Sequence, residues 1–421
     1  MFFIGCIRNI KETNEMKIVI HTMYFLPEFG SAPILMNELA VYLVKKGHEV
    51  EVVTTIPRPP NHKKYRWCLF KKEHMNGYAV KRYRTNFTVH PIGRLIAWTI
   101  YTWATLLNLF RVKKEDVLFL RLPPLQLGVT GVAARVLKKA RFILNVQDIH
   151  PDLSVESGIL SNPFLIRLAQ RFEKWIYRHS ERILVISDGF KNNLVKKGVD
   201  RNKVGIIPNW VDTDFLKPMP KKNALARRHA LHHKFVVMYS GTISISSIST
   251  LENILESASI LQKSSHILFV IVGEGMKKKE LVDKAKSLNL KNVIFLPFQP
   301  YEDLPALLAS SDILLVPLDK EKSLLSVPSK LYNFMAAGRP IMGLAHSDSE
   351  VKDLIETTEC GVCISPEDIP HIAKTIEELH ASSAALENMA HNARKHAVEN
   401  YAMDLVLDNL EKYILSEKKG E

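Results

Sequence analysis

The segment 326–342, SVPSKLYNFMAAGRPIM, has the residue types of a helix that can bind a phosphate group. Ser326 or Ser329 can cap its first turn, where Pro328 is also tolerated, and Gly338 ends it. The first N–H groups of such a helix have no partner inside the helix, and the helix dipole places partial positive charge at the same end. We therefore expect a diphosphate to bind there.

Lys330 and Asn333 add side-chain chemistry to this helix. Lys330 in the first turn supplies a full positive charge, and Asn333, three residues further on, shares its face and can hydrogen-bond a ribose hydroxyl. The alternative for Lys330 is a solvated surface lysine, which is the commoner role at such positions. The complete string favours a site for phosphate followed by ribose.

Acidic and imidazole side chains gather in a second string, QDIHPD, which follows an expected strand. A carboxylate from Asp148 or Asp152 can orient or deprotonate a hydroxyl group, and the imidazole of His150 can stabilise a departing phosphate. The alternative is an aspartate that caps the turn after the strand. Loops at strand ends collect catalytic residues, so this string is the second candidate site.

Two other strings imitate cofactor and metal motifs. GEG at 273–275 follows a strand, but Lys278 occupies the place of the third glycine of a dinucleotide fingerprint, so we expect no NAD and no other cofactor. DTD at 212–214 has the form of an Asp-x-Asp metal motif but lies in a linker, where a turn or capping role is favoured. We expect no metal site.

Short apolar runs alternate with amphipathic segments along most of the chain, which predicts an α/β fold with parallel sheets covered by helices on both faces. Strands are expected at KIVIHTM, EVEVVTT, DVLFLRLP, RFILNVQD, RILVISD and VGIIPN, and again at FVVMYSG, HILFVIVG, VIFLPF, DILLVPL, PIMGLA and CGVCIS. Two doubly wound, Rossmann-like domains in series leave a cleft between them, where ligands bind at the carboxyl ends of the strands.

The prolines and basic residues of 211–234 mark a linker between the two series of strands. We therefore expect a disordered extension at 1–15, an N-terminal domain at 16–210, a C-terminal domain at 235–400 and a last helix within 401–421. A chain of 421 residues is long enough for two such cores.

The formal net charge of +13 indicates a polyanionic partner, either an anionic membrane, a phosphorylated substrate or nucleic acid. Base is concentrated in residues 61–94, where Glu73 is the single acid, and the aromatic-rich apolar segment 92–110 follows. One interpretation is a buried core helix beside a solvated loop. The other is membrane contact through 61–110, in which Arg94 and Asn108 favour a peripheral attachment over a span.

Four cysteines, at positions 6, 68, 360 and 363, are too few and too scattered for a disulfide framework. The Cys360–Cys363 spacing has no second pair to complete a metal site, and it lies in a strand-like run. Buried structural thiols in a reducing, cytoplasmic compartment are expected.

SVPSKLYNFMAAGRP resembles the donor-binding signature of family 4 glycosyltransferases, which have the GT-B fold. Within that family it is most similar to the branch that adds amino-deoxy sugars, such as N-acetyl-fucosamine, during surface-polysaccharide assembly. IIPNWVDTDFLKP is similar to the family's crossover motif and SSDILLVPL to its penultimate C-domain strand, so that the resemblance runs from about Met16 to Tyr413. It implies a UDP-sugar donor, a lipid-linked or polysaccharide acceptor, retention without a metal, and a last helix that crosses back onto the N-terminal half.

The resemblance also implies roles for individual residues. YFLPEFGSAPI is similar to the family's acceptor loop and VQDIHPD to its acidic active-site loop. The implied acceptor residues are Glu28, Gly30, Ser31 and Asp152, and the catalytic residues are Asp148, His150 and Lys330. The implied donor residues are Gly241, Thr242, Gly273, Lys278, Phe298, Ser326, Ser329, Lys330 and Asn333.

This chain departs from the family pattern at three places. Leu325 and Asn333 stand where the family has two glutamates, Gln147 stands at its catalytic-histidine position, and the Gly241-Thr242 loop lacks its usual basic residues. The missing glutamates motivate one alternative, a catalytically weakened partner subunit. Another alternative is a UDP-sugar epimerase, which shares the two-domain fold but not the PNWVDTDF or PSKLYNFMAAGRP strings. Nucleic-acid binding is suggested by charge alone, without a recognisable motif.

Overall fold

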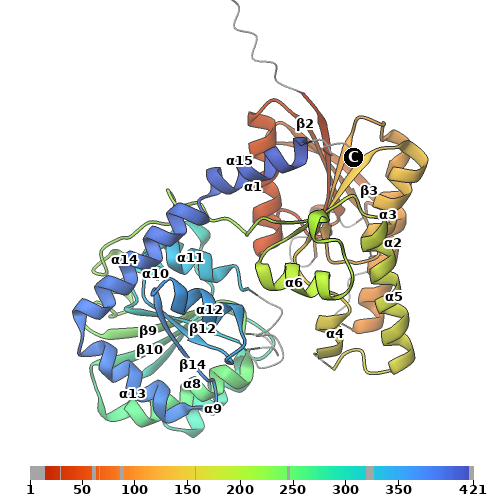
Figure 1. Cartoon of the computed structure of the whole chain (residues 1–421). Helices are drawn as coiled ribbons and strands as arrows, with labels where there is room; N and C mark the ends of the chain where they lie inside the picture. The colour runs from red at the N-terminus through yellow and green to blue at the C-terminus, as the bar shows by residue number, and fades with distance from the viewer. Residues whose placement is uncertain are drawn as a thin grey trace, which may run out of the picture.

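Two α/β units follow one another along the chain in the computed structural model (Figure 1). The structure describes residues 15–28, 30–58, 63–65, 67–85, 90–156, 158–243, 247–318 and 327–416. Each unit is built on a largely parallel sheet with helices on both faces, as the alternation of apolar runs predicts. The expectation of a disordered extension at 1–15 falls almost entirely outside the described residues.

The first sheet has eight strands in the order β3-β4-β2-β1-β5-β6-β7-β8. They span β1 Lys17–His21, β2 Glu49–Thr55, β3 Phe70–Met75, β4 Tyr78–Tyr83, β5 Val117–Leu122, β6 Arg141–Val146, β7 Arg182–Val185 and β8 Val204–Ile206. All neighbouring strands are parallel except β3 and β4. Both faces of the central strands are covered, which is why their sequences are continuous runs of Val, Ile and Leu.

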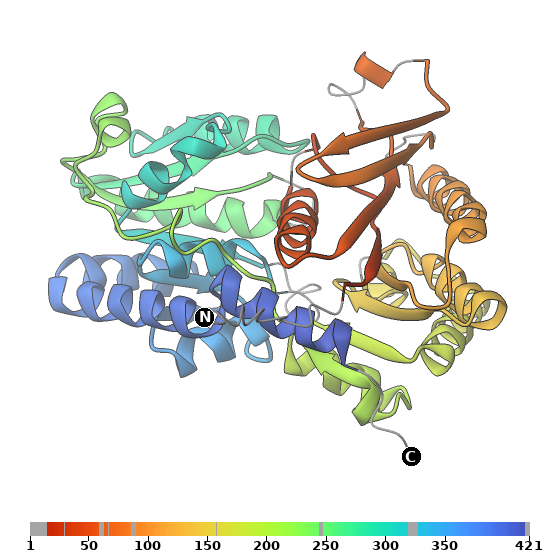
Figure 2. The same cartoon turned by 90° about the horizontal axis from the view of Figure 1, so that it is seen from above.

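Helices form two layers on this sheet. One layer holds α1 Ser31–Lys45 and α15 Met403–Leu415, and the other holds α2 Pro91–Asn108, α3 Leu127–Ala133 and α5 Pro163–His179 (Figures 1 and 2). The shorter helices α4 Asp152–Glu156 and α6 Asp188–Lys196 follow β6 and β7.

The second sheet has six parallel strands in the order β11-β10-β9-β12-β13-β14. They span β9 Phe235–Ser240, β10 Ile267–Val272, β11 Val293–Leu296, β12 Ile313–Pro317, β13 Ile341–Leu344 and β14 Gly361–Ile364. Its helices, with α7 in the preceding linker, are α7 Ala224–Arg228, α8 Ile248–Ile260, α9 Lys278–Ser287, α10 Leu304–Ala309, α11 Lys330–Ala336, α12 Glu350–Thr357, α13 Ile369–His380 and α14 Ser383–Asn400.

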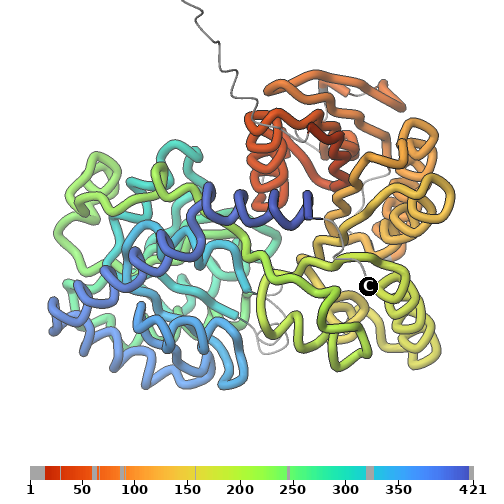
Figure 3. The backbone as a smooth tube through the Cα atoms, turned by 45° about the horizontal axis from the view of Figure 1, so that its top comes forward, coloured from red at the N-terminus to blue at the C-terminus, as the bar shows by residue number. Residues whose placement is uncertain are grey.

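The C-terminal helices cross back to the first domain, as the resemblance implies. The helix α14 packs on α11 of the second domain, and α15 crosses over α1 of the first (Figures 1 and 3). Leu407, Leu410 and Ile414 of α15 are buried in the core of the first domain, and burial of each such side chain stabilises the contact by about 1.5–3 kcal/mol. This crossing holds the two domains together.

The basic segment 61–94 is not simply a solvated loop, which corrects that part of the sequence analysis. β3 and β4 form an antiparallel hairpin that turns at Asn76-Gly77, where both residues have positive φ. Lys81 is buried and bonds Glu51 at 2.6 Å, and the buried Arg82 bonds Glu73 at 2.6 Å. These two cations are neutralised inside the domain and are not available to a membrane.

The apolar segment 92–110 forms α2 and the turn after it, and neither sequence interpretation describes it in full. Its inner face is buried through Ala97, Tyr101 and Ala104, as in a core helix. Its outer face exposes large apolar side chains: Ile92, Leu95, Ile96, Ile100, Trp103, Leu107 and Phe110. Within the described ranges, no helix is both long and apolar enough to cross a membrane.

The carboxyl ends of the two sheets meet between the domains. Glu350 begins α12 just after β13, and a Cβ atom built on Gly189, which lies just after β7, would be 1.5 Å from its Oε1 atom. Burial raises the pKa of Glu350, and the nearby Ser187 hydroxyl and Gly189 amide oppose that shift. Ligands that bind at strand ends of either sheet therefore bind at this boundary.

Candidate functional site

Two glycines bring the ends of β9 and β10 into direct contact. Gly241 N donates to Val272 O at 3.0 Å, and Gly273 N donates to Leu296 O at 3.0 Å. A Cβ atom on Gly273 would lie 1.9 Å from Gly241 O, and both glycines have a positive φ. Side chains are therefore excluded from this contact, and bare backbone lines the carboxyl edge of the sheet.

Lys330 lies over this glycine contact. Its Nζ atom is 4.2 Å from the centroid of the Tyr239 ring and would be 3.4 Å from a Cβ atom built on Gly241. The Tyr239 hydroxyl in turn donates to Thr242 O at 2.8 Å. The cation is held by an aromatic face and by the turn that follows β9.

The charge of Lys330 has no counter-charge in the part of the chain that the structure describes. The side chain is half-buried and forms no ion pair with any described carboxylate, unlike buried Lys81, which bonds Glu51. Burial lowers the pKa of Lys330 to about 7. An anionic ligand at this point would replace the missing partner and restore the charge.

The other expected donor residues differ in how close they lie to the glycine contact. Phe298 lies close by, because its Cε1 atom would be 3.6 Å from a Cβ atom on Gly273. Asn333 is on α11 one turn after Lys330, and Ser329 precedes that helix without a side-chain capping bond. Lys278 begins α9 and is paired with Glu274 at 2.7 Å. Ser326 and Leu325 lie outside the described residues.

Three of the expected acceptor residues lie together in the loop after β1. Glu28 is buried, and its Oε1 atom accepts from the backbone and Nε atoms of Arg58 at 2.8 and 3.0 Å. Gly30 has φ of +130° and precedes α1, whose first residue is the exposed Ser31. This loop follows the carboxyl end of β1 and is therefore at the same sheet edge as the other strand-end loops of the first domain.

The side chains of the string after β6 have different partners in the first domain. His150 bonds Ser154 at 2.9 Å and packs edge-on against Trp98 of α2, with ring centroids 5.8 Å apart. Burial, reinforced by Arg94, lowers the pKa of His150 to about 4, so the ring is neutral near pH 7. Asp152 bonds Lys197 at 2.8 Å and Asn193 at 3.2 Å. His150 and Asp152 thus have structural partners within the first domain.

Comparison with known proteins agrees with this geometry. The "Glycosyl transferase 4-like domain" model matches residues 32–210, and the "Glycosyl transferases group 1" model matches residues 224–396. Together they span most of the chain. The chain belongs to the group 1 glycosyltransferases.

Relatives and solved structures of glycosyltransferases cover nearly the whole chain. The putative colanic acid biosynthesis glycosyl transferase WcaI of Escherichia coli is 28% identical over 86% of this chain and 92% of its own. The probable glycosyltransferase WbjE of Pseudomonas aeruginosa is 28% identical over 64% of this chain and 67% of its own. The structure of Anabaena HepE in complex with UDP has a TM-score of 0.71 at 15% identity, covering 95% of this chain and 99% of HepE, and it shows that the fold is GT-B.

Two residues of this glycosyltransferase were missed by sequence reasoning. Arg121 is buried near the end of β5, and burial lowers its pKa to about 10 while Asp148 opposes that shift. Glu38 of α1 accepts from Trp210 Nε1 at 2.7 Å, and burial raises its pKa to about 7. A charged residue inside an otherwise apolar strand, as in DVLFLRLP, was the available signal for Arg121.

Asp212 has the turn role that the sequence analysis favoured, and of the three described cysteines only Cys360 is buried as expected, whereas Cys68 and Cys363 are half-buried. Asp212 Oδ1 accepts from the backbone N–H groups of Asp214 and Phe215 at 3.0 and 2.9 Å, which is a turn role. Among the described residues, no three His, Cys, Asp or Glu side chains are grouped to hold a metal. Cys360 is buried, and burial raises the pKa of the half-buried Cys363 to about 11.

The glycine contact predicts the effect of adding one methyl group. Gly273→Ala should lower the Tm by several degrees more than Gly47→Ala, because overpacking costs about 1–3 kcal/mol. Gly47 also has a positive φ, +94°, but nothing lies within 4 Å of its Cβ position. Comparing these two variants therefore separates the stability lost through the steric contact from the stability lost through backbone strain. Equal Tm values for the two variants would show that the β9 and β10 loops do not touch as described.

Proposed function

We propose that this protein moves a sugar of the amino-deoxy class from a UDP-sugar to a lipid-linked or polysaccharide acceptor, with retention of anomeric configuration and without a metal. The observation that carries the proposal is Lys330, a half-buried cation without a described counter-charge, placed over bare glycine backbone at a strand edge. The structures of HepE were determined with UDP and with UDP-glucose, and WcaI is named for colanic acid biosynthesis.

The bound diphosphate would lie between Lys330 and the loops that begin at Gly241 and Gly273. Hydrogen-bond donors and a cation that are already in place stabilise charge on the departing diphosphate without reorganisation. The bond from the anomeric carbon to the phosphate oxygen breaks, and the acceptor oxygen bonds the same face of that carbon. The acceptor proton passes to the departing phosphate. This front-face reaction retains configuration and uses no carboxylate nucleophile.

The first domain would hold the acceptor. Asp148 lies at the carboxyl end of the first sheet and interacts electrostatically with Arg121. Glu28 and Ser31 are on the loop after β1 at the same sheet edge. His150 and Asp152 hold the segment after β6 in place through their bonds to Ser154 and Lys197.

Lys330→Ala should weaken UDP binding by about tenfold to a hundredfold, because a charge-assisted phosphate contact is worth ~1.5–3 kcal/mol. Calorimetric titration with UDP measures the change. The control is Lys279→Ala, which removes an exposed lysine of α9 paired with Asp283 and should bind UDP as the parent does.

The same titration has an expected pH dependence. Lys330 is charged below a pKa of about 7 in the empty site, and a bound diphosphate favours the charged form. The affinity of the parent for UDP should therefore fall as pH rises above 7. The affinity of Lys330→Ala for UDP should not show this fall. Parent-like binding by Lys330→Ala at every pH would contradict the assignment of the site.

Transfer should continue in excess EDTA, because Lys330 and backbone amides meet the phosphate charge. The assay follows UDP release with a lipid-diphosphate sugar as acceptor, before and after chelation. A loss of turnover that Mg²⁺ or Mn²⁺ restores would refute metal independence. UDP binding without any turnover would instead favour the non-catalytic partner subunit.

We further propose that the outer face of α2 attaches the protein peripherally to the cytoplasmic face of a membrane. Trp103 and Phe110 are 64% and 80% exposed, and Leu107 lies between them. Exposed Arg111, Lys113 and Lys114 follow directly. An exposed aromatic and aliphatic face beside basic residues is typical of helices that lie in a membrane interface.

Trp103→Gln combined with Leu107→Gln should weaken binding to anionic vesicles at least tenfold, since each side chain loses apolar burial in the interface. Vesicle sedimentation measures this. Ile260→Gln with Val398→Gln, which replaces exposed apolar residues of α8 and α14, is the control. Equal binding by the α2 variant and the control would exclude α2 as the attachment surface.

A further inference from the structure

A buried arginine without a counter-charge lies at the carboxyl end of the first sheet. Arg121 is the next-to-last residue of β5 and is 8% exposed. Its Nε atom is sealed from solvent without a hydrogen-bond partner, and no described carboxylate forms an ion pair with it. The Nη atoms at the tip of the side chain are not sealed in this way. Because a buried cation without a partner is costly, a ligand that reaches this tip and supplies a negative charge would be favoured.

Polar groups from neighbouring segments surround Arg121. Asn145 of β6 is its register partner, so both side chains project on the same side of the sheet. Asn145 is also buried, and it accepts from Gln147 Nε2 at 2.8 Å. Asp148, just after β6, and Tyr24, in the loop after β1, interact electrostatically with Arg121. The carboxyl ends of β1, β5 and β6 therefore form a polar region that can hydrogen-bond a sugar.

The charges in this region favour a ligand with a single negative charge. Arg58 lies 4.5 Å above the Tyr24 ring and bonds Glu28 at 3.0 Å, so that this pair is neutral. Asp148 acts on Arg121 only at a distance. A carboxylate can bind the planar guanidinium group of Arg121 through two parallel hydrogen bonds. A diphosphate would bring more negative charge close to Asp148 and is less well matched.

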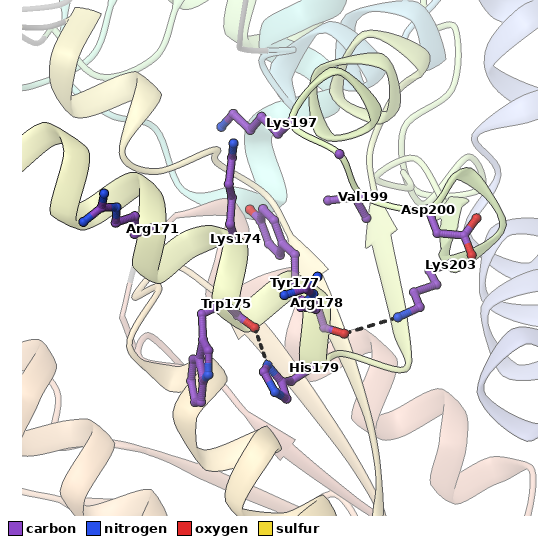
Figure 4. Close-up of a pocket in the computed structure, with 11 residues that line it drawn as sticks. Arg171, Lys174, Trp175, Tyr177, Arg178, His179, Lys197, Val199, Asp200 and Lys203 are labelled. Carbon is purple, nitrogen blue, oxygen red and sulfur yellow. Dashed lines mark hydrogen bonds between the residues drawn. The ribbon is translucent and has the colours of Figure 1, made fainter.

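The basic pocket between α5 and the segment after α6 is a different kind of site (Figure 4). Its lining residues Arg178 and Lys203 lie just before β7 and β8, at the amino ends of these strands. Arg171, which also lines it, is exposed to solvent. The pocket is therefore at the opposite edge of the first sheet from Arg121, and an acid attracted by charge alone could bind at either place.

We propose that Arg121 binds a carboxylate of the acceptor, so that the acceptor sugar belongs to the class of uronic acids. A uronic acid held in this way has its hydroxyl groups in the same strand-end region as Asp148, the residue that would orient the acceptor hydroxyl. A neutral hexose leaves the buried guanidinium group unpaired, so the site discriminates against it. The inference rests on the proposed function in that the first domain holds the acceptor, and it adds the charge of that acceptor.

The test compares sugars that differ only in the carboxylate. The probes are the methyl glycosides of glucuronic and galacturonic acid and those of glucose and galactose, titrated into the full-length protein with and without UDP and followed by ligand-observed NMR. The parent should bind at least one uronoside about tenfold to a hundredfold more tightly than the matching hexoside, because its carboxylate forms charge-assisted hydrogen bonds. Arg121→Gln should lose this preference. Arg121→Lys should keep part of it, since the charge remains but the paired donors do not.

Arg171→Gln is the matched control, because it removes an exposed arginine of the basic pocket. It should prefer the uronoside as the parent does. Calorimetric titration with UDP shows whether each variant keeps a folded second domain, and a circular-dichroism melt reports the folding of the first. Should Arg121→Gln unfold, Arg121→Lys decides the outcome. Failure of the proposed donor site would appear as absent UDP binding by the parent, which is independent of any preference among the glycosides.

Three results would overturn the proposal. Equal binding of uronosides and hexosides by the parent would exclude a carboxylate site. A preference that a folded Arg121→Gln retains would place the acid elsewhere, and its loss in Arg171→Gln would place it in the basic pocket. The third arm uses methyl glucoside 6-phosphate. If this probe binds more tightly than either uronoside and does so only when Arg121 is present, the site is one for a phosphate group and not for a carboxylate.

Discussion

The structure depends on the close approach of two backbone segments that lack side chains. Gly273 touches Gly241 at the ends of β10 and β9, and Lys330 covers this contact with a cation that lacks a described counter-charge. The carboxyl ends of parallel strands lie at one edge of a sheet, so the loops that follow the strands of both sheets lie at the domain boundary. The crossing of α15 onto the first domain keeps the two edges together. A desolvated cation at such an edge would be stabilised by an anionic ligand.

Much of the fold could be predicted because parallel strands buried on both faces have an unmistakable pattern. EVEVVTT is β2 over the same residues, and PIMGLA and CGVCIS contain β13 and β14. The position of Lys330 in its helix could be predicted for a different reason. Ser329 precedes α11 and Gly338 follows it, so that a lysine at position 330 is expected in the first turn. The neutral state of His150 could not be predicted, because it depends on burial beside Arg94 and Trp98.

The β3–β4 hairpin shows where reading by hydrophobicity fails. FKKEHM has few apolar residues. From the sequence alone, Lys81 and Arg82 would be placed on the surface, because their carboxylate partners are not known at that stage. Glu51 is distant in sequence from Lys81, and no local pattern indicates their ion pair. The Asn76-Gly77 dipeptide was the available signal, since it favours the turn of a two-residue hairpin.

The central claim is that the diphosphate of the donor lies over the glycine contact and is held by Lys330. A crystal structure of the protein with UDP tests this claim most directly. The account predicts diphosphate oxygens within hydrogen-bonding distance of Lys330 Nζ and of the backbone amides that follow β9. Density for the diphosphate elsewhere, with Lys330 Nζ still against the Tyr239 ring, would contradict it.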